Sequence, residues 1–486
     1  MNIRIIQKSL TYCLLVLFVF VAFSCDNFLD VNDDPNAATE APGDFLFSEA
    51  SAVLQSNRNI ELGSTVPFFI QTFASNNSAG GLFMAPERYN VGPSDFAITN
   101  NFGGIYTNVL NNLALYIRDI EGSTPARPNA VAQARLVRDY TFYYLTTLFG
   151  DVPFSEANDP NIDAPAFDNQ QDILDSLVVR IDDSIDMINT GDQSDAIGTA
   201  DLFYKGDMDK WLRFANSLKL RILMLQYNTD TSVASEIQSL INNPNLIRSN
   251  DANFRFPYFE ESGRENQMFQ LHADFAGGEP GFFYAGEVLV DEMNADNDPR
   301  RQIMFDTNYA GNYVGVPAGE TETDSLVSTL GSAITIPTFP GRILGASETL
   351  LHEAEFLAKE GSFVQARSKL EGGIRASINY LEDSTPVSIS QSDKDTYVQD
   401  ILSDYDTASN AGKVEEIQLQ LYIDLFEQVP ENWTNWKRTK VPSLDLPNGA
   451  TLGSVIRRLP ISAEEIAANP NAPDQVPLDT PMSFEE

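Results

Sequence analysis

The chain has 486 residues, of which 43% are hydrophobic and 10% aromatic, and its formal net charge is −38. This charge argues against nucleic acid and anionic lipid surfaces as partners, and its simplest account is a solvated acidic surface around a large packed core. With only two histidines and two cysteines, the chain is also a poor candidate for a His/Cys centre for zinc, haem or an iron–sulfur cluster.

The first 24 residues have the pattern of a secretory signal. Arg4 and Lys8 precede an apolar stretch, 10–23, which is shorter than the roughly twenty residues needed to cross a hydrocarbon core. The small residues before Cys25 resemble the lipobox of bacterial lipoproteins. We therefore expect residues 1–24 to be a lipoprotein signal peptide and Cys25 to carry lipid. The alternative is an ordinary signal peptide with an incidental Cys25.

Helical periodicity dominates the chain after a polar lead-in. Residues 25–44 are rich in Asp, Asn and Pro, which is typical of a tether, and we expect 45–486 to form a single domain. Gly150 and Pro153 end one of the helices, because glycine can take the left-handed conformation and proline cannot continue the helix. The helices expected in this half of the chain are 45–54, 106–120, 130–149, 173–188 and 211–226.

The middle of the chain has a different composition. From about 242 to 345 it is rich in Gly, Pro, Asn and aromatic residues, which predicts long loops with short strands and one helix near 284–293. Helices are expected again at 348–359, 363–380 and 414–428, followed by irregular coil. The fold class predicted from these patterns is therefore mainly α, with a loop-rich middle.

The junction around Gly361 is similar to that of a tetratricopeptide repeat. Gly361 turns the chain between two helices, and Ala354, Ala358 and Ala366 are small enough to let those helices approach closely.

The sequence carries no catalytic motif of the kinds that short patterns reveal. It has no G-x-S-x-G elbow, P-loop, H-E-x-x-H or G-x-G-x-x-G pattern. We expect His272 to be a loop residue and His352 a helix-face residue, and the acidic run 291–298 lacks the glycine of a calcium loop. We therefore predict no catalytic residue, no metal and no cofactor. A glycan hydrolase stays open as an alternative, because 69 carboxylates can always supply a pair.

Six segments, in one order along nearly the whole chain, resemble the SusD/RagB family of nutrient-binding outer-membrane lipoproteins of Bacteroidetes. They are CDNFLDVNDDPN (25–36), LFGDVPFSEA (148–157), WLRFANSLKLR (211–221), NDPR (297–300) with YVGVPAG (313–319), ASETLLHEAE (346–355) and WTNWKRTKVP (433–442). Most of these segments also have a structural reading as helix ends or framework.

The resemblance implies an α-helical fold with four tetratricopeptide-like helix pairs and an irregular half. It also implies a lipid-anchored place on the outer membrane at the cell surface. The implied partner is a TonB-dependent, SusC-like transporter, which the lipoprotein covers as a lid while it captures oligomeric nutrient. A peptide-binding or scaffold lipoprotein remains an alternative.

Two loop clusters have the residues that a glycan site requires. The apolar face of a sugar ring stacks on aromatic side chains, and amides, carboxylates and guanidinium groups bind its hydroxyls. The predicted ligand-binding residues are Phe83, Arg88, Tyr89 and Asn90 in the first cluster and Phe282, Phe283 and Tyr284 in the second. Because consecutive aromatic residues cannot all face one core, we expect at least one of the last three to point outward. Core packing is the alternative for any single one of them.

Overall fold

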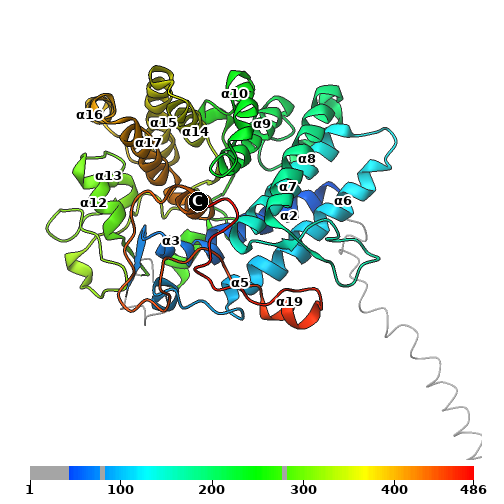
Figure 1. Ribbon diagram of the computed structural model, residues 1–486, viewed down its shortest axis with the longest axis horizontal. Coiled ribbons are helices and arrows are strands. Elements are labelled where there is room, and N and C mark those ends of the chain that lie inside the picture. Colours follow the sequence, from blue (N-terminus) through cyan, green and yellow to red (C-terminus); the bar gives the residue numbers. More distant parts are fainter. Residues whose placement is uncertain (1–42, 77–82, 276–281, 486) are drawn as a thin grey trace, which may run out of the picture. The chain divides into compact units, whose positions relative to one another are not determined.

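The helices lie side by side and make the frame of the molecule (Figure 1). The computed structural model describes residues 43–76, 83–275 and 282–485, which belong to one compact unit, Asp44–Glu486. The expected signal peptide 1–24, Cys25 and almost all of the expected tether 25–44 lie outside the described residues. No helix in the described ranges is long and apolar enough to cross a membrane.

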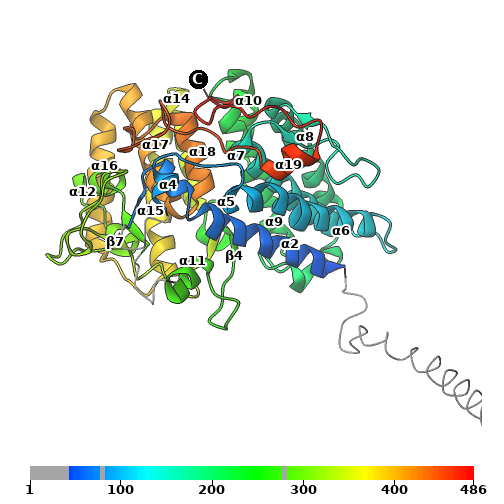
Figure 2. The same cartoon turned by 90° about the horizontal axis from the view of Figure 1, so that it is seen from below.

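The longer helices correspond closely to the predicted ones. They are α2 (Asp44–Ser56), α6 (Asn111–Glu121), α7 (Pro128–Phe149), α8 (Gln170–Thr190), α9 (Met208–Gln226), α10 (Ala234–Asn242), α14 (Ala346–Lys359), α15 (Phe363–Ser384), α16 (Gln391–Thr407), α17 (Asn410–Asp424) and α18 (Val429–Thr439). The two views agree that α6, α7 and α8 lie toward one end of this array and α15, α16 and α17 toward the other (Figures 1 and 2). The mainly α fold class is confirmed.

Short elements connect these helices. The helical ones are η2 (Asn57–Leu62), α3 (Val66–Phe69), α4 (Met84–Glu87), α5 (Phe96–Thr99), η4 (Asn100–Gly104), η5 (Tyr106–Leu110), η6 (Gln193–Asp195), η7 (Gly198–Ala200), η8 (Thr231–Val233), η9 (Asn250–Ala252), α11 (Gln267–Gln270), η10 (Leu271–Phe275), α12 (Glu287–Ala295), α13 (Arg301–Met304), η11 (Asp324–Leu326), η12 (Leu425–Glu427) and α19 (Ala463–Ala468). The strands are β1 (Phe73–Ser75), β2 (Val152–Pro153), β3 (Phe167–Asp168), β4 (Phe254–Phe256), β5 (Phe283–Ala285), β6 (Phe305–Asp306), β7 (Thr329–Leu330) and β8 (Gly341–Leu344).

The junction between α14 and α15 has the predicted form. Gly361 has φ +75° and turns the chain, while Ala354, Ala358 and Ala366 are buried between the helices. Gly373 also lets the helices approach, since a Cβ at this position would lie 2.7 Å from Cγ of Leu351. Small residues thus set the spacing of this helix pair.

The segments that carry the family resemblance are tied together by buried charge pairs. Arg221 of α9 pairs with Glu348 of α14, and Arg438 of α18 pairs with Glu355 of α14. Arg300 donates to Asp298 at 2.6 Å, so this carboxylate serves the framework. The preference for a structural reading of these segments is supported by these contacts.

The loop-rich middle contains a four-stranded sheet in the order β1-β5-β7-β6, with antiparallel neighbours. The helix predicted near 284–293 begins later, at Glu287, because Phe283, Tyr284 and Ala285 pair with β1 as a strand.

The remaining differences from the predicted helices are local. The helix predicted at 106–120 begins as the π-helical η5, and that predicted at 414–428 runs from Asn410 to Asp424 and gives way to η12. Helices α10, α16 and α18 are additions to the predicted set.

Candidate functional site

The pairing of β1 with β5 brings the two predicted loop clusters together. Ser75 lies opposite Phe283, and beyond them the amide of Asn76 donates to the carbonyl oxygen of Phe282 at 3.1 Å. The end of β1 and the start of β5 are therefore the same end of the sheet. Residues 77–82 and 276–281, which belong to the predicted clusters, lie outside the described residues.

Aromatic rings from both clusters meet at this end of the sheet. The ring of Phe83 lies 5.9 Å from that of Phe282, edge to face, and 5.1 Å from that of Phe283. Its other neighbour is Phe68, in a stacked arrangement at 5.9 Å. Phe83 and Phe282 are half-buried, whereas Phe283 is fully buried. We call Phe83 and Phe282 the aromatic surface.

Phe283 and Tyr284 face opposite sides of the sheet, and both sides are covered. Phe283 packs on Phe73 at 5.4 Å in the main core, while Tyr284 is buried with Val316 and Val327. The residue of this trio that keeps partial exposure is Phe282. Side chains alternate along a strand, so Phe283 points into the main core and Tyr284 points to the second face of the sheet. Because that second face is also covered, Tyr284 is buried as well.

The first cluster also contains both buried and partly exposed residues. Tyr89 is buried, and its ring lies edge-on to Phe69 at 6.2 Å. Arg88 is half-buried and donates from Nη2 to the carbonyl oxygen of Gly319 at 3.1 Å. Asn90 is exposed, with its backbone amide bonded to the carbonyl oxygen of Ala85. Among the described residues of this cluster, Arg88 and Asn90 are therefore polar residues that keep some exposure to solvent.

A buried carboxyl group, that of Glu87, is hydrogen-bonded to this end of the sheet. Oε1 of Glu87 accepts from the amide of Ser75 at 3.2 Å, and the side chain has no exposure. Burial raises the pKa of Glu87 to about 7, although hydrogen bonds from the Gly319 and Ser75 amides oppose the rise. Its charge therefore changes close to neutral pH.

The two histidines lie on separate helices and have structural contacts. His352 lies on α14, as predicted, with Nε2 3.6 Å from Glu348. His272 lies on η10 and not in a loop, and its ring stands edge-on to Phe283 at 5.7 Å. Among the described residues, no group of three His, Cys, Asp or Glu side chains is placed to hold a metal ion.

Comparison with known proteins identifies the family. A family model described as SusD-like, "Starch-binding associating with outer membrane", matches residues 35–460. The chain belongs to the SusD-like family. This family consists of non-catalytic binding proteins associated with the outer membrane. No curated protein matches this SusD-like chain.

Solved structures share its fold. A chitin-binding protein has 24% identity and a TM-score of 0.73, with coverage of 88% of this chain and 95% of its own. A SusD/RagB family protein from Bacteroides thetaiotaomicron has 20% identity and a TM-score of 0.73, covering 89% and 95%. A chitin-binding SusD homolog from Flavobacterium johnsoniae has 18% identity and a TM-score of 0.70, covering 88% and 93%. At these identities the likeness establishes the SusD-like fold alone.

Proposed function

We propose that this SusD-like protein captures a neutral oligosaccharide on the aromatic surface formed by Phe83 and Phe282. The observation that carries the proposal is the meeting of these two half-buried rings, 5.9 Å apart, from segments distant in the sequence. A half-buried ring that packs against other rings is already held in place, so little side-chain freedom is lost when a sugar stacks on it.

The other predicted residues divide into two roles. Arg88 and Asn90 stand beside the aromatic surface in the chain and supply hydrogen bonds to sugar hydroxyls. Tyr89, Phe283 and Tyr284 are buried and act by supporting the backbone that presents the exposed residues.

The protein acts at the cell surface and passes the glycan to a TonB-dependent, SusC-like transporter. We infer that residues 1–24 are removed, that Cys25 carries the lipid anchor, that 25–44 is the tether and that 45–486 is a single domain. The pattern of the first 25 residues supports the anchor, and the family's outer-membrane association supports the location. Two relatives named for chitin binding favour a glycan over a peptide as cargo.

Affinity electrophoresis of the protein without its lipid anchor, residues 26–486, tests the proposal against a panel of neutral and acidic polysaccharides. We expect retardation by a neutral glycan, with no released oligosaccharide in the same mixtures. Phe83→Ala and Phe282→Ala should each weaken it several-fold, because aromatic contacts contribute about 1 kcal/mol or more. Released products, or retardation that survives both substitutions together, would contradict the proposal.

Tyr309→Ala is the matched control. Tyr309 is 94% exposed, but it follows β6, whose end lies at the opposite end of the sheet from Phe282. Its removal should leave the retardation unchanged. Loss of binding in this variant alone would place the glycan on the other end of the sheet.

A further inference from the structure

A hollow of about 360 Å³ lies beside α8, against the segment that links β2 to β3. Neither Phe83 nor Phe282 lines it. Helix α12, which closely follows β5, and helix α8 lie toward opposite ends of the helical array (Figures 1 and 2). The hollow is therefore separate from the aromatic surface. Its lining includes Phe154, Asp168, Asp172, Ser176, Val179 and Arg180.

Arg180 presents an unused guanidinium group to this hollow. Its Cζ lies 4.0 Å from the ring centre of Phe154, which is itself held edge to face against Phe142 at 4.8 Å. The ion pair of Arg180 with Oδ1 of Asp139 is long, at 3.9 Å, and among the described residues the guanidinium donates no hydrogen bond. Because the side chain is 33% exposed, a ligand can reach it. Arg180 is thus held in place by stacking while its N–H donors stay free.

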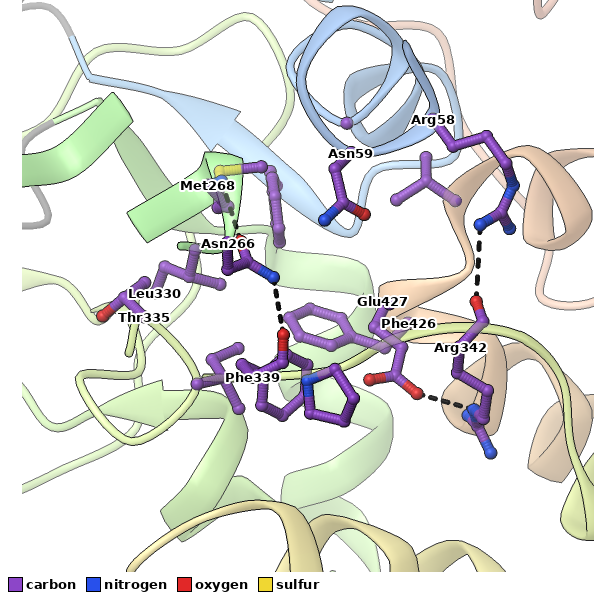
Figure 3. Close-up of a pocket in the computed structure, with 16 residues that line it drawn as sticks. Arg58, Asn59, Asn266, Met268, Leu330, Thr335, Phe339, Arg342, Phe426 and Glu427 are labelled. Carbon is purple, nitrogen blue, oxygen red and sulfur yellow. Dashed lines mark hydrogen bonds and ion pairs between the residues drawn. The ribbon is translucent and has the colours of Figure 1, made fainter. Parts of the chain in front are cut away.

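The cavity beside Glu427 differs in this respect (Figure 3). It has a volume of about 70 Å³, and the carboxylate of Glu427 forms an ion pair with Nε of Arg342 at 2.7 Å. Arg58, on another wall, donates to Gln55 and to Glu431. These charged groups already pair with partners in the protein, so the cavity offers a ligand little beyond its apolar wall.

Hydrogen-bond acceptors line the same face of α8 as Arg180. Asp172 lies in the first turn of α8 and is exposed, and among the described residues its carboxylate accepts no hydrogen bond. Ser176 donates to the carbonyl oxygen of Asp172 at 2.7 Å, which leaves its own oxygen free to accept. Asp168 is already engaged, because it accepts from the amide of Phe154 at 3.0 Å. Since Asp172, Ser176 and Arg180 follow one another at a spacing of four residues, they lie along one face of the helix.

The charges around the hollow favour a neutral ligand. Burial, together with Arg138 and Arg135, lowers the pKa of Arg180, so further positive charge is disfavoured here. Asp168 and Asp172 disfavour an anion for the opposite reason. A sugar matches the groups that remain, because its hydroxyl oxygens can accept from a guanidinium and its hydroxyl hydrogens can donate to a carboxylate.

We propose that this hollow is a second glycan-binding site, which takes a sugar unit of a neutral polysaccharide already held on the aromatic surface. Arg180 donates to hydroxyl oxygens of the sugar, and Asp172 accepts from a hydroxyl group. The side chain of Val179, which is 62% exposed, packs on the C–H groups of the ring. This inference rests on the proposed glycan-binding function and adds a second point of contact for the same polysaccharide chain.

The second site acts through the length of the glycan. Because Arg180 covers the ring of Phe154, the hollow has no open aromatic face there, and we expect it to bind a short oligosaccharide weakly. Once a long chain is held at the aromatic surface, the second contact becomes intramolecular, and such linkage can raise apparent affinity by about 10²–10⁴-fold. The site should therefore strengthen the binding of polysaccharides and leave that of short oligosaccharides unchanged.

Two measurements on the full chain test the proposal. Affinity electrophoresis uses gels that contain soluble starch, hydroxyethyl cellulose or glycol chitin, and titration calorimetry uses maltotriose, cellotriose or chitotriose. We expect Arg180→Met to weaken retardation by the polysaccharide that binds by about tenfold or more, while the affinity for the matching trisaccharide stays the same. Ser176→Leu, which fills the hollow from the preceding turn of α8, should do the same and provides a second route if Arg180→Met unfolds.

Arg375→Met is the matched control, because the side chain of Arg375 is also 33% exposed but belongs to α15 and does not line the hollow. Its retardation should equal that of the unaltered protein. Unchanged retardation of both hollow variants, or an equal loss of trisaccharide binding, would overturn the second site while leaving glycan binding at the aromatic surface intact. If no glycan binds the unaltered protein, the proposed function and the second site are both overturned.

Discussion

Arg221 of α9 and Glu348 of α14 form a two-pronged ion pair with N–O distances of 2.6 and 2.7 Å. Both side chains are buried, and Nη2 of Arg221 also donates to the carbonyl oxygen of Ile343 on β8. One guanidinium thereby joins two helices of the frame to the strand that leads into α14. Burial alone would raise the pKa of Glu348, but the charge and hydrogen bonds of Arg221, together with His352, outweigh it and hold that pKa at about 2.

Arg221→Met should destabilise the protein by about 3–5 kcal/mol, because it leaves the Glu348 carboxylate buried without its main partner. Urea unfolding followed by circular dichroism measures the change. Arg367→Ala, at the partly exposed pair with Asp406, should cost no more than about 1 kcal/mol. The double variant Arg221→Met, Glu348→Leu should recover part of the loss, and a loss as large as that of the single variant would contradict this account.

Glu87 makes stability depend on pH in the opposite direction from Glu348. Its folded pKa of about 7 lies above the ordinary value of 4.5, so the stability associated with its protonated form is lost as pH rises through 7. Relative to the unaltered protein, Glu87→Gln should therefore gain about 2 kcal/mol in unfolding free energy between pH 5 and pH 8. Glu121→Gln, at a side chain 44% exposed, should show no such trend. A pH-independent difference for Glu87→Gln would argue against burial of the charged form.

The spacing of α14 and α15 can be tested with two adjacent glycines. Gly373→Ala would place Cβ 2.7 Å from Cγ of Leu351 and should cost about 1–3 kcal/mol through overpacking. Gly372→Ala meets Leu350 at an ordinary 3.5 Å and should instead stabilise the helix by up to about 1 kcal/mol. Thermal melting of both variants measures the two changes. Equal changes in melting temperature would show that helix propensity alone determines the effect of each substitution.

The C-terminal segment contributes to the core although most of it is coil. Phe484 is fully buried, with Nζ of Lys437 5.6 Å from its ring centre. Phe484→Ala should destabilise the protein by about 3–5 kcal/mol, measured by urea unfolding. Phe96→Ala removes the same atoms from a ring that is 83% exposed and should change stability little. A small effect of Phe484→Ala would mean that the segment detaches without disturbing the core.

The helices were predictable because their apolar residues form broad stripes. Ile173, Leu177 and Ile181 of α8 are all buried, as their spacing indicated. Helix α16 was missed because its buried residues, such as Val398 and Ile401, are embedded in a sequence dominated by Asp, Ser and Gln. In such a helix the packing of neighbours supplies the stability, and the local pattern is weak.

The candidate site was predictable in its parts but not in its assembly. Local composition pointed to Phe83 and Phe282, yet their contact depends on β1 and β5, which are three residues long and show no usable period. The burial of Tyr284 depends on Val316 and Val327 from another loop. The cavity beside Glu427 draws residues from Arg58 to Val429, so no segment of sequence reveals it.

The hydrogen bond between the Asn76 amide and the Phe282 carbonyl has a consequence for engineering new specificities. Because main-chain atoms make this closure and the β1–β5 ladder behind it, the side chain of Phe282 can be exchanged without removing either. A library at this position would therefore sample new ligands while the strand pairing stays constant.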